Sequence, residues 1–274
     1  MKLERVSHST LAQAARCGEQ LRFRLQEGPE PPGFALIRGR AVAKSIEANM
    51  TAKLREGAAL PVELLAELTR DAVVSECAAG DVRLDADGEQ TFDQARDETI
   101  DSAVELSDLH ARKVAPGIAP TAVEARIELV SGSLPVPLVG VLDLIALEPS
   151  GGESIRDAKT TGKKPPDDSA DVSDQLTVYD ALYRAERGRK PERLVLDHLV
   201  ESTKTMGPRA FEHDTTPREP ADFDALSQRI ERVVRMVELE LWIPAPETAW
   251  WCSAKSCGYW PRCAFARGRA RPTS

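Results

Sequence analysis

Two carboxylates and a lysine in the middle of the chain have the types and spacing of a metal-dependent hydrolytic site. Asp143 interrupts an otherwise apolar run, GVLDLIALE, over residues 140–148, and Asp157 and Lys159 lie in the segment ESIRDAKTT. A lone carboxylate in a buried strand costs several kcal/mol unless it is paired. Asp143 therefore needs a partner.

The short PSGG segment between these two runs predicts a β-hairpin. If the hairpin is symmetric about Ser150, Asp143 lies opposite Asp157, and the two carboxylates repel each other unless a cation lies between them. Lys159 falls on the same face as Asp157 because side chains alternate along a strand. The pattern predicts an oxygen-lined pocket for a divalent metal with an ammonium group beside it. The alternative is a surface ion pair of Asp157 with Lys159, with Asp143 at a strand end.

A second candidate metal site lies in the segment WWCSAKSCGYWPRC, which holds Cys252, Cys257 and Cys263. Thiolates favour zinc or iron–sulfur clusters. A fourth ligand is then needed, and spacing alone leaves both Cys17 and Cys77 open. The alternatives are three unrelated thiols or a structural zinc site.

Composition sets wide bounds. The 274 residues, 42% of them hydrophobic, suffice for one large domain or two small ones. The net charge of −8 argues against an extensive basic surface but not against a local basic groove. The start of the sequence, MKLERVSHST, lacks the apolar run of a signal peptide, and no stretch is long enough to span a membrane. We therefore expect a cytoplasmic protein with reduced cysteines.

Hydrophobic periodicity and turn residues predict helices, then strands, then helices again. The acidic segment over 81–94 resembles a calcium loop, but it lacks the first and last carboxylates and is interpreted as a linker. The order favours an α/β or mixed α+β fold with a small central mixed sheet. The expected helices cover 11–25, about 39–54, 61–77, 92–113, 172–187 and 221–242, and the expected strands cover 123–132, 135–148, 154–161, 193–200 and 209–213.

The motifs GVLDLI, DAKTT and QLTVYDALY lie between the N-terminal Cys17 and the three C-terminal cysteines. In this order they resemble the RecB-like branch of the PD-(D/E)XK nuclease superfamily, and most closely the CRISPR-associated iron–sulfur exonucleases and their phage-encoded relatives. The resemblance runs from Cys17 to Cys263. It implies a single RecB-like nuclease domain over 1–274, with a helical part at 11–113, a restriction-endonuclease-like core at 120–215, and a C-terminal helix and cysteine cluster at 219–274.

The resemblance also implies roles for individual residues. Asp143 and Asp157 would hold a catalytic Mg²⁺ or Mn²⁺ ion together with the backbone carbonyl of Ala158. Lys159 would orient the attacking water and stabilise charge on the phosphate.

Two further motifs follow from the same resemblance. Gln175 and Tyr179 match the QxxxY motif, and their four-residue spacing places them on one helix face. Cys77 would be a core thiol. The implied 4Fe–4S cluster would be bound by Cys17, Cys252, Cys257 and Cys263.

One position departs from the family pattern. The family's GxxxH motif supplies a metal-ligand histidine, but the sequence RGRAVAKSIEA has Ala43 at that position. Glu47, one turn further along, is a candidate substitute or second-metal ligand. A natural loss implies weaker metal binding, whereas a deliberate His-to-Ala change implies a trapped, inactive protein.

The function expected from these motifs is a metal-dependent DNA exonuclease acting on single strands or DNA ends, in phage recombination or CRISPR spacer acquisition. The alternative is a catalytically impaired nuclease fold that binds DNA ends or protein partners. No GxxxxGK[ST] loop is present, so the sequence encodes no ATP motor. The protein would act alone, processively through a groove or a homo-oligomeric ring, or beside a helicase, recombinase or CRISPR integration partner. Candidate DNA-guiding cations are Arg16, Arg22, Arg24, Arg38, Arg40, Lys44, Lys163, Lys164 and Lys204.

Overall fold

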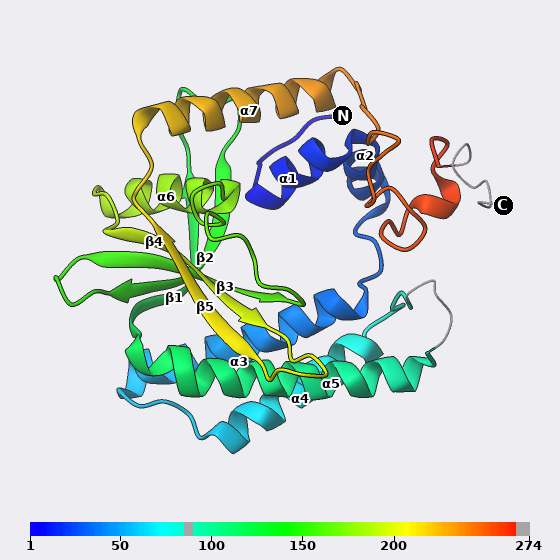
Figure 1. Cartoon of the computed structure of the whole chain (residues 1–274). Coiled ribbons are helices and arrows are strands. Elements are labelled where there is room, and N and C mark those ends of the chain that lie inside the picture. The colour runs from blue at the N-terminus through cyan, green and yellow to red at the C-terminus, as the bar shows by residue number, and fades with distance from the viewer. Residues whose placement is uncertain (85–89, 267–274) are drawn as a thin grey trace.

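The computed structural model describes residues 1–84 and 90–266, and it is built around a five-stranded sheet (Figure 1). The strand order follows the chain, β1-β2-β3-β4-β5, and every neighbouring pair is antiparallel except β3 and β4, which are parallel. The parallel pair requires a crossover, and helix α6 supplies it. The expected mixed α/β class is confirmed. The strands are β1 (Ala119–Leu129), β2 (Leu138–Leu147), β3 (Glu153–Thr161), β4 (Arg193–Val200) and β5 (Arg209–Thr215).

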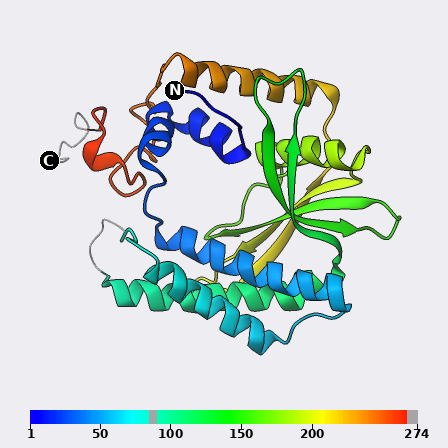
Figure 2. The ribbon, with the colours of Figure 1, turned by 180° about the vertical axis from the view of Figure 1, so that it is seen from behind.

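Helices cover both faces of this sheet (Figures 1 and 2). One group packs with the largest apolar core: α1 (His8–Arg16), α6 (Asp174–Arg187) and α7 (Pro220–Glu238). The other group lies on the opposite face: α3 (Phe34–Glu56), α4 (Val62–Ala78) and α5 (Phe92–Leu109). None of the helices within the described residues is both long and apolar enough to cross a membrane.

The β2–β3 hairpin has the register that its sequence predicts. Leu144 pairs with Arg156 and Leu147 with Glu153, so the hairpin is symmetric about Ser150. Gly151 adopts a φ of 91°, a conformation that glycine reaches without steric cost, and this closes the turn. The register places Asp143 and Asp157 at facing positions, one step beyond the last recorded pair.

The expected first helix over 11–25 is wrong, because the chain breaks there into two helices. Cys17 is extended, with a φ of −169°, and separates α1 from α2 (Gly18–Glu27). The Gly18 amide donates to the carbonyl of Ile243 at 2.6 Å, and a Cβ on Gly18 would lie only 2.6 Å from the Ile243 amide nitrogen. A close approach of two distant backbone segments therefore requires both the break and the glycine.

Other differences lie at element ends. The third helix, α3, begins at Phe34 rather than near residue 39, and α7 ends at Glu238 rather than at 242. A π-helical turn (His110–Val114) and a 3₁₀ turn (Ala115–Gly117) follow α5, and a 3₁₀ turn (Trp260–Arg262) lies near the end of the described chain. Residues 85–89, in the acidic 81–94 segment interpreted as a linker, lie outside the described residues.

Candidate active site

Two acidic side chains meet at the centre of the sheet. Asp157 on β3 is 1% exposed, and Asp143 on β2 is half-buried. Burial, the neighbouring Asp157 carboxylate and a hydrogen bond between the two side chains raise the pKa of Asp143 well above its usual range. This repulsion within the pair favours a cation between the carboxylates.

Lys159 supplies one positive charge at this pair. Its Nζ lies 2.7 Å from Asp157 Oδ2, and its side chain is 41% exposed, whereas that of Asp157 is fully buried. Lys159 therefore reaches from solvent to the buried carboxylate, as expected for residues two positions apart on one strand face. The alternative of a solvated surface pair does not fit a buried Asp157.

Two side chains on one face of helix α6 form hydrogen bonds to the two carboxylates. Gln175 Nε2 donates to Asp157 Oδ1 at 2.9 Å and to the Tyr179 hydroxyl at 2.8 Å. The Tyr179 hydroxyl donates in turn to Asp143 Oδ1 at 3.3 Å. Ser173 caps the helix by accepting from the Leu176 amide, so the glutamine lies in a fixed first turn. Burial raises the pKa of Tyr179, which keeps its hydroxyl a donor.

The oxygen atoms at this point fit a divalent cation. Asp157 Oδ2 is buried and makes no hydrogen bond of acceptable geometry, although the Lys159 ammonium lies beside it. A buried carboxylate oxygen without a donor is costly, and Mg²⁺ or Mn²⁺ accepts such oxygens as ligands. Among the described residues no three His, Cys, Asp or Glu side chains already stand in metal-binding geometry.

A small cavity of about 20 Å³ adjoins Asp143, with room for about one water molecule. Ala43 and Glu47 line it from α3, and Asp143 and Ala158 line it from the sheet. The structure thus brings Glu47 and Ala158 to the predicted site. Ala43 leaves the α3 wall without an imidazole.

Glu124 on β1 also lines this cavity and was not predicted from the sequence. The β1–β2 register pairs Val123 with Leu144 and Ala125 with Leu142, which puts Glu124 at the position facing Asp143. Its φ of 50° is rare for a residue with a side chain, and such outliers gather at functional sites. Burial and the charge of Glu47 raise its pKa. The alternating pattern of the strand predicts that Glu124 faces solvent, so the sequence does not indicate that it lies at the site.

The cysteine segment lies against the break between α1 and α2. Cys17 Sγ accepts from the Ala245 amide at 3.3 Å, and Trp251 Nε1 donates to the Arg16 carbonyl at 3.3 Å. Burial raises the pKa of the Cys257 thiol, and the nearby thiols of Cys17 and Cys252 raise it further.

The thiols of Cys17 and Cys252 thus lie close enough to Cys257 to interact with it electrostatically, but among the described residues no three cysteines stand in metal-binding geometry. Cys263 follows the turn over 260–262 in the same segment, and Tyr259 stacks on Phe23 of α2 at 5.2 Å between ring centroids. Cys77 packs instead against the core formed by α3, α4 and α5. All five cysteines are free thiols.

Within the described residues, four of the nine candidate DNA-guiding cations lie in ion pairs. Each of these four pairs with a nearby carboxylate, so a phosphate has to displace that carboxylate to bind. Those pairs are Arg22–Glu19, Arg38–Glu201, Arg40–Glu76 and Lys164–Asp167.

A mixed sheet with two facing acidic residues, a lysine two positions beyond the second, and a helix that bonds to both defines a metal-dependent nuclease class. The profile of the PD-(D/E)XK nuclease superfamily matches residues 5–264, and the chain belongs to this superfamily. Its nucleases typically use divalent metals, and the family implies a DNA substrate.

A solved structure shares the fold of this chain. A protein named "Putative exonuclease" from Eubacterium rectale matches with a TM-score of 0.56 and 14% identity, over 99% of this chain and 90% of that chain. The structure of SSO0001 matches with a TM-score of 0.43 and 14% identity, over 97% of this chain and 88% of that one. No curated protein sequence matches the chain.

Proposed function

We propose that this nuclease is a metal-dependent DNA exonuclease that hydrolyses phosphodiester bonds in single-stranded DNA or at DNA ends. The observation that carries the proposal is the facing pair of Asp143 and Asp157 with Lys159 Nζ at 2.7 Å. The restriction-endonuclease-like fold and the exonuclease name of the Eubacterium rectale protein support it.

Asp143, Asp157 and the Ala158 carbonyl would hold the metal, and Glu124 and Glu47, which line the same cavity as Asp143 and Ala158, would be further ligands. A bound Mg²⁺ or Mn²⁺ supplies Lewis acidity and lowers the pKa of a water molecule. Lys159 places a positive charge beside the scissile phosphate and orients the attacking water.

Gln175 and Tyr179 act through the carboxylates. Their hydrogen bonds fix the rotamers of Asp157 and Asp143, which leaves the remaining oxygen lone pairs directed at the metal. Side chains that hold ligands in this way are positioning residues.

We further propose that Cys17, Cys252, Cys257 and Cys263 bind a 4Fe–4S cluster that joins the start of the chain to its cysteine segment. The support is the proximity of Cys17, Cys252 and Cys257, together with soft thiolate donors in a loop-rich segment. Iron, sulfide and zinc analysis of protein purified without oxygen tests this. About four iron and four sulfide per chain is the expected result, and stoichiometric zinc without iron contradicts it.

A second candidate function is favoured by Ala43, which leaves the α3 wall of the cavity without the imidazole found in the family's motif. This candidate is an impaired nuclease that binds DNA ends or protein partners. A cytoplasmic helicase, recombinase or CRISPR integration complex, in phage recombination or spacer acquisition, is the setting we propose for either function.

The test uses single-stranded and duplex DNA labelled at each end in turn, incubated with Mn²⁺ and with EDTA. The wild-type protein, Ala43→His and the control Ala35→His, on the exposed start of α3, are compared. Stepwise shortening by the wild type supports the exonuclease, and cleavage by Ala43→His alone supports the impaired form. Absence of cleavage by all three proteins contradicts the nuclease proposal.

A further inference from the structure

A row of side chains leads from the catalytic lysine to the edge of the sheet. Lys159 on β3 pairs with His198 on β4, and His198 pairs with Phe211 on β5. Paired residues on adjacent strands point to the same face. Two strand spacings of about 4.8 Å place the backbone of Phe211 about 10 Å from that of Lys159.

Cations and a histidine surround the Phe211 ring. Lys164 Nζ lies 5.4 Å and the Arg209 guanidinium 5.8 Å from the ring centroid. His213, two residues further along β5, stacks at 6.4 Å with an angle of 29° between the ring planes, and its Nδ1 lies 3.0 Å from that of His198. We call Lys164, Arg209, Phe211 and His213 the β5 platform.

The β5 platform carries positive charge from Arg209 and Lys164, and none of its four residues is acidic. Arg209 makes no ion pair within the described part of the chain, and its buried Nε has no hydrogen-bond partner. Lys164 pairs with Asp167 at 2.7 Å, and the same carboxylate lies 3.8 Å from His213 Nε2. The Asp167 side chain is 85% exposed and occupies the place of an anion between two nitrogen donors.

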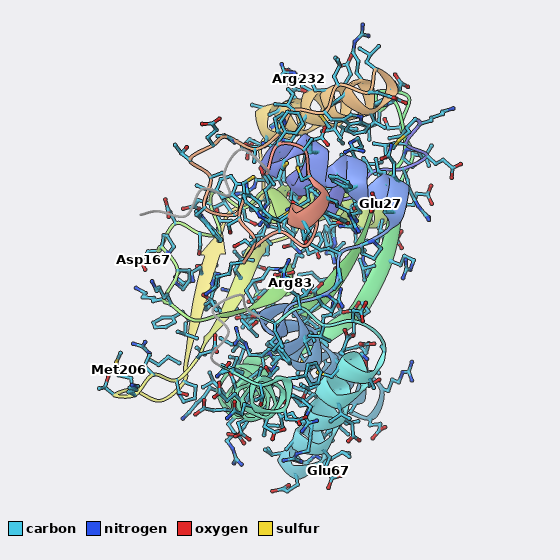
Figure 3. The ribbon with its side chains drawn as sticks, turned by 90° about the vertical axis from the view of Figure 1, so that its right-hand side faces the viewer. Glu27, Glu67, Arg83, Asp167, Met206 and Arg232 are labelled. Carbon is cyan, nitrogen blue, oxygen red and sulfur yellow. The ribbon has the colours of Figure 1, made fainter. Side chains whose placement is uncertain are left out.

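The platform lies on an accessible flank of the molecule. Figure 3 shows Asp167 and, at the tip of the β4–β5 hairpin, Met206 on the same flank. The β5 strand is the edge of the sheet, so no further strand lies beyond Phe211. A strand of nucleic acid can therefore pass from Lys159 across this edge into solvent.

We propose that the β5 platform binds an unpaired nucleotide of a DNA single strand next to the scissile phosphate. The base stacks on Phe211, Arg209 and Lys164 contact the backbone phosphates, and Asp167 yields its place to a phosphate oxygen. In a duplex the bases are already stacked within the helix, so an aromatic platform selects single-stranded DNA. This inference rests on the proposed nuclease function for the position of the scissile phosphate.

The test is fluorescence anisotropy with a labelled oligothymidylate in EDTA, which prevents cleavage. Phe211→Ala should weaken binding by about 5- to 150-fold, because stacking of one base is worth about 1–3 kcal/mol. Phe211→Trp should restore it. The matched control is Phe223→Ala on α7, another phenylalanine contacted by an arginine, with Arg184 at 4.8 Å, and it should bind as the wild type does.

Two charge variants extend the test. Arg209→Ala should weaken binding and lower the slope of log affinity against log salt by about 0.7, the value for one lost phosphate contact on a single strand. Asp167→Asn should tighten binding. Thermal melting of each variant shows that the fold is retained.

The outcomes separate this inference from the proposed function. Wild-type affinity in both Phe211→Ala and Phe223→Ala, or no binding by the wild type, overturns the platform. Cleavage of DNA by the wild type in Mn²⁺ together with unchanged binding by Phe211→Ala overturns the platform alone. Phe211-dependent binding by a wild type that cleaves no DNA supports the platform and contradicts the active exonuclease, leaving the impaired nuclease as the function.

Discussion

The carboxylate hairpin and the cysteine segment position their reactive groups in different ways. The hairpin holds Asp143 and Asp157 by a regular strand ladder and by hydrogen bonds from one helix face. The cysteine segment brings Cys257 to Cys17 through loops, with single contacts such as the Ala245 amide on Cys17 Sγ. Regular backbone geometry fixes the positions of the carboxylates before any metal binds. The positions of the thiols in the cysteine segment would depend far more on the cluster proposed for them.

The largest effect is expected at the hairpin. Lys159→Met should reduce the rate of DNA cleavage by about 10²–10³-fold, the usual cost of removing one group that stabilises transition-state charge. Single-turnover cleavage of labelled DNA measures this. Lys113→Met, at an exposed lysine in the π-helical turn that follows α5, serves as the control and should keep the wild-type rate. Equal rates in both variants would remove Lys159 from the chemistry.

A substitution in the cysteine segment should lower the stability of the fold rather than the rate of cleavage. Cys257→Ser should lower the free energy of unfolding by about 3 kcal/mol, and Tm by about 5 °C, because the 4Fe–4S cluster proposed above would lose a ligand. Differential scanning calorimetry measures this, with Cys77→Ser as the control for loss of a half-buried thiol. A Tm that falls equally in both variants would show that Cys257 is an ordinary buried thiol.

Gln175→Ala sharpens the claim that α6 positions the hairpin carboxylates. Loss of its bonds to Asp157 and Tyr179 should reduce cleavage by about 10–100-fold. The apparent Mn²⁺ affinity, measured from the metal dependence of the rate, should fall with it. A lower rate at unchanged metal affinity would show that the glutamine acts on DNA rather than on the ligands.

The pH dependence of stability tests the repulsion within the hairpin pair. The pKa of Asp143 is higher in the folded state than in the unfolded state, so folding takes up a proton at any pH between these two pKa values. The metal-free protein therefore loses stability as pH rises through the folded-state pKa. Asp143→Asn should therefore raise Tm by a few degrees at about pH 9 and by less at about pH 5. Mn²⁺ should remove the difference by stabilising only the wild type. A Tm difference that is constant with pH contradicts the coupling.

The fold and the hairpin were predictable because both depend on short-range periodicity. Apolar runs and turn residues located the five strands, and symmetry about Ser150 gave the observed register. The four-residue spacing of Gln175 and Tyr179 likewise predicted a shared helix face. Each of these inferences uses geometry that neighbouring residues impose on one another.

What the sequence did not reveal depends on distant contacts. The break at Cys17 exists because the Ile243 backbone approaches Gly18, and no local pattern reports that approach. Glu124 enters the cavity through a backbone conformation rare for glutamate, although its position in the strand suggests a solvent-facing residue. The β5 platform likewise requires the strand order, which places β5 beyond β4.

The smallest effect is expected at position 43. Ala43→His adds an imidazole to the cavity wall beside Glu47 and should increase metal affinity severalfold, because a nitrogen ligand complements the carboxylates. The Mn²⁺ concentration that gives half-maximal cleavage measures this. An unchanged midpoint would show that the carboxylates alone complete the site.

Mn²⁺ binding by isothermal titration calorimetry tests the central claim most directly, which is that the facing carboxylates share a divalent cation. Wild-type protein and Asp157→Asn are titrated under the same conditions at neutral pH. The structure predicts that Mn²⁺ binds to the wild type and that this binding is lost in Asp157→Asn, which remains folded. Equal Mn²⁺ binding by the two proteins would contradict it.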